Sequence, residues 1–171
     1  RSFARPRELG LASDSCGELV YYLHQNATSG LNTVLLASSD SATADIVALA
    51  ATTTNQGTVL AAPGVPGAFA VATVNVGSGE IINAAPSVTD PALPVTLTIC
   101  ETNPDGTCLA PPANSVTRSI ASNETPTFSV FVDTTTSIPF LPADNRIRLV
   151  FTDPVGNVKG ATSVAVASSV P

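Results

Sequence analysis

Between residues 94 and 167 the sequence consists of short segments in which apolar and polar side chains alternate. Residues 127–133 and 145–152 are the clearest cases, and Gly, Pro, Asn and Asp separate the segments. A period of two places successive side chains on opposite faces of a strand, so that one face can be buried while the other stays exposed. Several such strands with frequent turns predict an all-β, antiparallel β-sandwich.

The composition supports this fold class. Of the 171 residues, 44% are hydrophobic, which is enough for a core, while Met and Trp are absent. Val, Ile and Thr are abundant, and their branched side chains suit a pleated surface. The 14 Pro and 11 Gly favour many short strands and turns.

One segment is ambiguous between helix and strand. Residues 45–51 are rich in Ala, which favours a helix, but the run is short and its boundaries are turn-like, so we predict a strand. We expect the strands of the sandwich at 45–51, 58–61, 68–76, 79–84, 94–100, 115–121, 127–133, 137–141, 145–152 and 158–167.

The residues before 45 divide into three segments. Residues 1–17 are broken by Pro and Gly and predict an extended arm. Residues 18–37 contain two apolar runs around a turn and predict a β-hairpin, compatible with the remnant of a preceding domain. Residues 38–44 are small and polar and predict a linker, which leaves 45–171 for the sandwich. Because the chain begins at Arg1 without an initiator Met, we expect a processed or excised product.

Cys100 and Cys108 flank a segment that contains Pro-Asp-Gly, a strong turn signal. A turn between two strands brings its flanks within disulfide range, so we predict a Cys100–Cys108 disulfide. Disulfides imply an oxidising, extracytoplasmic compartment. The alternatives are two reduced, separately buried thiols, or a zinc site, for which two Cys without a nearby His supply too few ligands. Cys16 is then left over.

The distribution of charge excludes several classes of partner. The formal net charge is −6, and no Lys or Arg occurs from Glu8 to Thr117. A stretch without bases cannot neutralise phosphates, so neither nucleic acid nor an anionic membrane surface is an expected partner. No apolar run approaches the length of a transmembrane span.

Two short motifs invite a chemical interpretation that their context does not support. His24 is the single histidine, and no nucleophile elbow accompanies it, so we interpret it as a strand residue. Gly77-Ser78-Gly79 lacks the third glycine and the following helix of a phosphate loop, and it predicts a hairpin turn.

The carboxylates and aromatic residues do not form a recognisable site either. Glutamates 80, 101 and 124 are isolated, so no facing pair for glycoside hydrolysis is evident. The aspartates lie at strand ends and turns without an Asp-x-Asp-x-Asp-Gly run, so turn formation is preferred to calcium binding. Tyr21 and Tyr22 are adjacent and would point to opposite faces of a strand, which disfavours a sugar platform. We expect no enzymatic activity, no cofactor and no metal.

Several strings resemble a known group of modules. They are TICETNPDGTCLAPP at 98–112, TPTFSVFV at 125–132, NRIRLVF at 145–151 and GATSVAV at 160–166, supported by 30–37, 45–52 and 67–77. Together they resemble Ig-like β-sandwich modules of secreted or periplasmic bacterial proteins over about residues 30–167. The resemblance implies an Ig-like, extracytoplasmic and non-catalytic module, and it supplies no catalytic residues.

These observations favour a structural or interaction module of the cell envelope, which packs against other proteins or against itself. The arm, with Arg1, Phe3, Arg5 and Arg7, is expected to dock onto an acidic or apolar neighbour. The alternative is an accessory domain, binding carbohydrate or calcium, of a larger secreted enzyme or adhesin.

Overall fold

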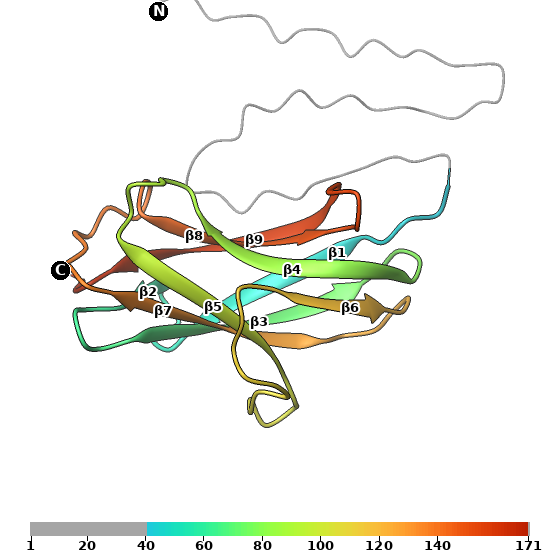
Figure 1. The fold of residues 1–171 in the computed structure, drawn as a ribbon, viewed down its shortest axis with the longest axis horizontal. Helices are drawn as coiled ribbons and strands as arrows, with labels where there is room; N and C mark the ends of the chain where they lie inside the picture. The colour runs from blue at the N-terminus through green and yellow to red at the C-terminus, as the bar shows by residue number, and fades with distance from the viewer. Residues whose placement is uncertain (1–40, 171) are drawn as a thin grey trace, which may run out of the picture.

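A computed structural model describes residues 41–170 of the chain, and in this range it contains nine strands and no helix (Figure 1). The prediction of an all-β protein is therefore confirmed. The strands are β1 (Ile46–Thr52), β2 (Thr58–Leu60), β3 (Gly67–Asn75), β4 (Glu80–Val88), β5 (Val95–Thr102), β6 (Val116–Ile120), β7 (Thr127–Thr134), β8 (Arg146–Thr152) and β9 (Val158–Ala167).

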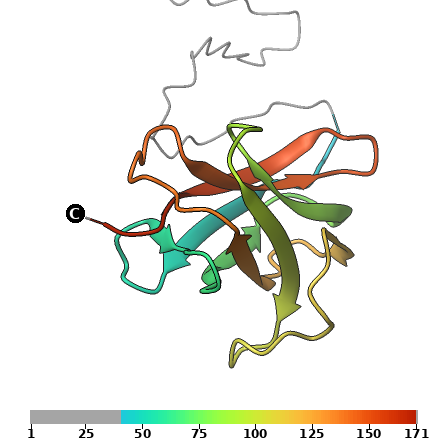
Figure 2. The same ribbon diagram turned by 60° about the vertical axis from the view of Figure 1, so that its left-hand side comes forward.

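The strands form two sheets that lie face to face as a β-sandwich, as two views of the ribbon show (Figures 1 and 2). The four-stranded sheet has the order β1-β3-β7-β5, and the five-stranded sheet has the order β2-β9-β8-β4-β6. The paired strands described are antiparallel except for β2, which runs parallel to β9. The sequence predicted a purely antiparallel sandwich, but the five-stranded sheet contains one parallel pair, at the edge formed by β2.

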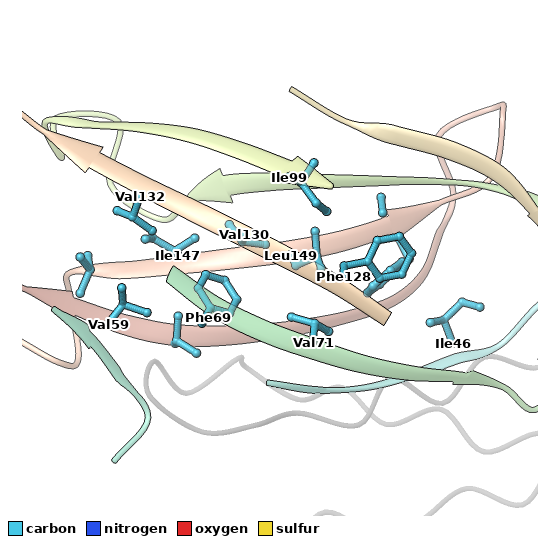
Figure 3. Packing of buried hydrophobic residues seen from close by; sticks show 14 of the residues in the cluster. Ile46, Val59, Phe69, Val71, Ile99, Phe128, Val130, Val132, Ile147 and Leu149 are labelled. Atoms are coloured by element: carbon cyan, nitrogen blue, oxygen red, sulfur yellow. The ribbon is translucent and has the colours of Figure 1, made fainter. Parts of the chain in front are cut away.

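The core lies between the sheets and is filled by alternate residues of each strand (Figure 3). Phe128, Val130 and Val132 of β7 point inward, and each is at most 1% exposed. From the facing sheet Phe151 reaches Phe128, with ring centroids 5.7 Å apart and the rings tilted by 58°. Offset and tilted aromatic pairs of this kind add to the free energy gained from burial alone. The alternation that predicted β7 and β8 thus corresponds to their buried faces.

Strand β4 is longer than the sequence indicated, because it continues through Pro86 to Val88. Proline cannot donate a hydrogen bond to a sheet, so it is tolerated where one side of the strand has no partner. Strand β6 pairs with β4 only from Glu80 to Ala84, which leaves β4 as an edge strand at Pro86. On its other side Pro86 lies opposite Leu149 of β8.

The strand predicted at 137–141 is wrong, because this segment is an irregular loop. Pro139 interrupts it, and its hydrogen bonds go to residues outside the strands, including the Ser168 N–H, which donates to the Ile138 carbonyl at 2.9 Å. The Ile138 N–H donates to Ser168 Oγ at 2.8 Å, and Asn145 Nδ2 donates to the Pro139 carbonyl at 2.9 Å. Ile138 is nevertheless 2% exposed, so its apolar character reflects core packing in a loop.

The hairpin turn predicted at Gly77-Ser78-Gly79 is also wrong, because β3 and β4 belong to different sheets and the segment crosses between them. The crossing runs close to the start of the domain. A Cβ on Gly77 would lie 2.2 Å from the Thr43 carbonyl oxygen, so a side chain does not fit there. Glycine therefore allows the backbone of the crossing to pack directly against Thr43.

Candidate interaction surface

The outward side of the four-stranded sheet carries almost no charge. Its strand registers place Val47 opposite Val74, and Leu49 opposite Ala72, on the side away from the core. Phe131 of β7 lies opposite Ala68 on the same side. We name this surface the outer apolar face; it consists of Val47, Leu49, Ala51, Ala68, Ala70, Ala72, Val74, Thr127, Ser129 and Phe131.

The largest side chains of the outer apolar face are well exposed. Leu49 is 68% exposed and Val47 is 53% exposed. Scattered surface apolar residues are normal, but a contiguous apolar surface on one sheet marks an interaction site in most soluble proteins. Asp133, at the end of β7, is the one charged residue that the register places on this side of β1, β3 or β7. This face is therefore the candidate interaction surface.

The outward side of the five-stranded sheet is different in character. Arg148 of β8 is exposed there, opposite Ser87 on one side and Ser163 on the other. Arg146 is partly covered, and its guanidinium donates to Ser163 Oγ at 2.8 Å and to the Pro142 carbonyl at 2.9 Å. Burial lowers the pKa of Arg146 because it disfavours the charged form. One outer face is thus apolar and the other is basic and polar.

A first ion-pair cluster ties the two sheets together. Arg118 of β6 forms salt bridges with Glu101 of β5 and with Glu124 of the loop before β7. The side chains of these three residues are between 20% and 36% exposed. The two glutamates are isolated in the sequence, but the fold brings both to the same arginine. The arrangement positions them as structural partners of Arg118.

A second cluster surrounds Lys159 of β9. Its ammonium lies 3.2 Å from Asp153 Oδ2 and 3.6 Å from Glu80 Oε2, and it also donates to Thr43 Oγ1. Asp153 accepts further hydrogen bonds from the Val155 and Asn157 N–H groups and from Asn157 Nδ2, at 2.7 to 3.0 Å. Burial of the Asp153 carboxyl would raise its pKa, but these hydrogen bonds and Lys159 outweigh burial and lower it to about 2.

We predict an acid-dependent loss of stability that Asp153 carries in part. Its folded pKa of about 2 lies below the ordinary value of 3.8, so the charged form favours folding at neutral pH. The contribution is complete above pH 3.8 and is lost as the pH falls through about 2. Urea unfolding at a series of pH values measures this dependence. Asp153→Asn should be less stable than wild type at pH 7 and should have a flatter curve below pH 4. Parallel curves would contradict the assignment.

A disulfide joins Cys100 of β5 to Cys108, with Cα atoms 5.6 Å apart. The enclosed turn projects from the body of the domain (Figure 2). Gly106 has a φ of 87°, a conformation that favours glycine. Asp105 accepts a hydrogen bond from the Thr107 N–H at 2.9 Å, and hydrogen bonds from Thr107 and Asn103 lower the pKa of its carboxyl. This hairpin is closed both covalently and by its own turn chemistry.

Removing the disulfide should cost about 2–3 kcal/mol of unfolding free energy, because the bond restricts a short loop in the unfolded chain. The double variant Cys100→Ser/Cys108→Ser, compared with wild type by urea unfolding, measures this cost. A loss below about 1 kcal/mol would indicate that the loop is already constrained in the unfolded state.

The structure describes only some of the residues singled out in the sequence. Arg1, Phe3, Arg5 and Arg7, together with Cys16, Tyr21, Tyr22 and His24, lie outside the described range. The predicted hairpin at 18–37 lies outside it as well. Within residues 41–170 no group of three or more His, Cys, Asp or Glu side chains is placed to hold a metal ion. No helix in the same range has the length and hydropathy to span a membrane.

No family model matches the chain, and no curated protein matches it. The fold and the outer apolar face define its class: a β-sandwich domain with one apolar and one polar outer surface.

Proposed function

We propose that this chain is a non-catalytic structural or interaction module, Ig-like in its fold and located outside the cytoplasm. It packs against other proteins of the cell envelope or against itself. The observation that carries this proposal is the outer apolar face, where Leu49 is 68% exposed on a sheet whose other side is packed in the core. Covering such a surface gains about 25 cal/mol for each Å² of apolar area removed from water.

The extracytoplasmic location is supported by the chemistry of the hairpin. A disulfide between Cys100 and Cys108 is stable in oxidising compartments and rare in the cytosol. The low charge density supports a role in contacts, since few charges on this face would have to be desolvated when a neighbour packs on it. The docking role of Arg1, Phe3, Arg5 and Arg7 remains part of the proposal, as a second contact beside the sandwich.

Site-specific photo-crosslinking in the native host tests the proposal. A photoreactive residue replaces Leu49 on the outer apolar face in one variant, and Arg148 on the polar face in a matched control. We expect a discrete crosslinked adduct from position 49 and little from position 148. If position 49 gives no more adduct than position 148, the outer apolar face is not a contact surface and the proposal loses its support.

A further inference from the structure

We propose that the outer apolar face binds the same face of a second copy of this chain, so that two sandwiches form a homodimer with a two-fold axis. This inference rests on the proposed function and specifies its partner. The edges of the sheet, and the relief, charge and size of the outer apolar face, favour a second copy of the chain as the partner that covers it.

The edges of the four-stranded sheet favour packing on its face over strand addition at its sides. Beyond β5, the chain pairs back on itself, with reciprocal hydrogen bonds of 2.8 and 2.9 Å between Ile99 and Ala113. At the other side, the start of β1 lies against β9, where a Cβ on Gly160 would be 2.0 Å from the Ile46 carbonyl oxygen. Both edges are thus partly occupied by the chain itself. An added strand would have to displace these contacts, whereas no segment within residues 41–170 pairs across the face, where Val47 and Leu49 are exposed.

The relief of the face is self-complementary. Val47 and Leu49 are large and well exposed on β1 and form a ridge there, and Phe131 is a large, half-buried side chain on β7. Between them β3 presents a floor of Ala68, Ala70 and Ala72, all of which are exposed. A second copy related by a two-fold axis can lay its ridge on this floor while its own floor receives the first ridge. Such isologous matching of one patch with itself is how most symmetric dimers are built.

The charge of the face also favours a second copy over a charged partner. The central residues of the face are Ala, Val, Leu, Thr, Ser and Phe, so a partner with charged groups would lose their hydration without gaining an ion pair. Two copies meet without opposing like charges at the centre of the contact, although the chain as a whole has a net charge of −6. Asp133 is the acidic residue that the registers of β1, β3 and β7 place on this face, and it lies at the end of the face.

The size of the face predicts a weak dimer. The three strands of the face, spaced about 4.8 Å apart, each with about seven residues rising about 3.3 Å, span roughly 330 Å² in the plane of the sheet. Two copies together would bury roughly 700 Å² before side-chain relief is added, which is below the roughly 1,200–2,000 Å² typical of stable complexes. We therefore expect a reversible equilibrium between monomer and dimer, with the dimer populated at high micromolar concentration and not at nanomolar concentration.

Sedimentation equilibrium of the purified full chain over a wide concentration range tests the inference. All proteins carry Cys16→Ser, so that an intermolecular disulfide through this cysteine cannot contribute. We expect wild type to show concentration-dependent dimerisation, and Leu49→Glu to weaken it at least tenfold because the dimer would bury two carboxylates. The control Ile81→Glu changes an apolar residue that is 51% exposed on the other sheet, and it should dimerise like wild type.

Unfolding curves of the two variants establish that both are folded. The inference is overturned if the wild-type chain stays monomeric at high concentration, or if Leu49→Glu dimerises as tightly as Ile81→Glu. These failures are distinguishable from failure of the proposed function. A monomeric chain that crosslinks from position 49 to a different protein in the native host would leave the interaction role standing and remove only the second copy as its partner.

Discussion

Replacing Gly160 with alanine is expected to destabilise the domain by roughly 3 kcal/mol or more, and this is the largest effect we predict for a single methyl group. Gly160 lies in β9 where the five-stranded sheet meets β1 of the other sheet. A Cβ added there would lie 2.0 Å from the carbonyl oxygen of Ile46 and 2.9 Å from its carbonyl carbon. Both are backbone atoms, so no flexible side chain can move to relieve the overlap.

The strand that would have to move is itself fixed. β1 pairs with β3 from Ile46 to Thr52, and Ile46 is 3% exposed in the core. Relief of the clash therefore requires either separation of the sheets at this end or loss of pairing at the start of β1. Urea unfolding at neutral pH measures the effect through the midpoint and the slope.

Gly79→Ala is the matched control. A Cβ at this position would approach the Ala121 Cα at 3.4 Å, an ordinary contact distance. We expect its stability to stay within about 0.5–1 kcal/mol of wild type, which is usual for a change that breaks no contact. If Gly160→Ala were as stable as Gly79→Ala, the close approach of β1 and β9 would be incorrect.

The strands that could be predicted from the sequence are those with one buried and one polar side. In β7 and β8 alternate apolar residues are buried, and this alternation identifies both strands, although Phe131 and Val150 are also apolar on the outward side. The Ala-rich run at 45–51 is also a strand, since β1 spans Ile46–Thr52. Short length and turn-like boundaries were therefore better guides there than the helix propensity of alanine.

The strand wrongly predicted at 137–141 lies where side-chain and backbone groups outside the strands satisfy the backbone. The loop around Ile138 is apolar like a strand, but Ser168 and Asn145 supply its hydrogen bonds. Ser168 is 30 residues from Ile138 and Asn145 is six residues from Pro139, and the alternation of apolar residues predicts neither contact. The same limit applies to Gly77, because the sequence marks a turn but not the sheets that the turn connects.

The outer apolar face also has a signal in the sequence, in strand β3. Residues 67–75 read GAFAVATVN, with Ala at the positions between Phe69, Val71 and Thr73. A half-exposed strand normally has polar residues at alternate positions, and β3 has alanines there instead. A strand with apolar residues on both sides indicates that something packs on each side. On one side this is the core, and on the other it is the partner proposed for the outer apolar face. Which other strands extend the face depends on strand order, and strand order requires the structure.

Replacing Asn75 with alanine is the second large effect that we predict, with a loss of about 3 kcal/mol. Asn75 ends β3, is 0% exposed, and uses its whole carboxamide. Its Oδ1 accepts from the N–H groups of Asp45 and Gly77, each at 3.1 Å. Its Nδ2 donates to the carbonyls of Ser78, Ile120 and Ala121, at 2.7, 3.2 and 3.3 Å.

One side chain thus joins the start of β1, the crossing between the sheets and the end of β6. Alanine would leave these backbone groups without their partner and would open a small cavity. An unsatisfied buried polar group costs about 1–3 kcal/mol, and cavity formation adds to this cost. Relaxation or an entering water would recover part of the loss, so a total of about 3 kcal/mol is expected and not the full sum.

Asn83→Ala provides the comparison within β4. Asn83 is half-buried on the outward side, and its Oδ1 accepts one hydrogen bond, from Thr117 Oγ1 at 2.9 Å. Water can replace that bond, so we expect a loss of unfolding free energy below about 1 kcal/mol.

Asn75→Asp tests the hydrogen bonds of Oδ1 and Nδ2 separately. The variant keeps an oxygen that can accept from Asp45 and Gly77, but it replaces the Nδ2 donor with a carboxylate oxygen that faces three carbonyls. At neutral pH we expect Asn75→Asp to be at least as unstable as Asn75→Ala, measured by urea unfolding. If Asn75→Asp were nearly as stable as wild type, the Nδ2 hydrogen bonds would not be what holds this end of the sandwich together.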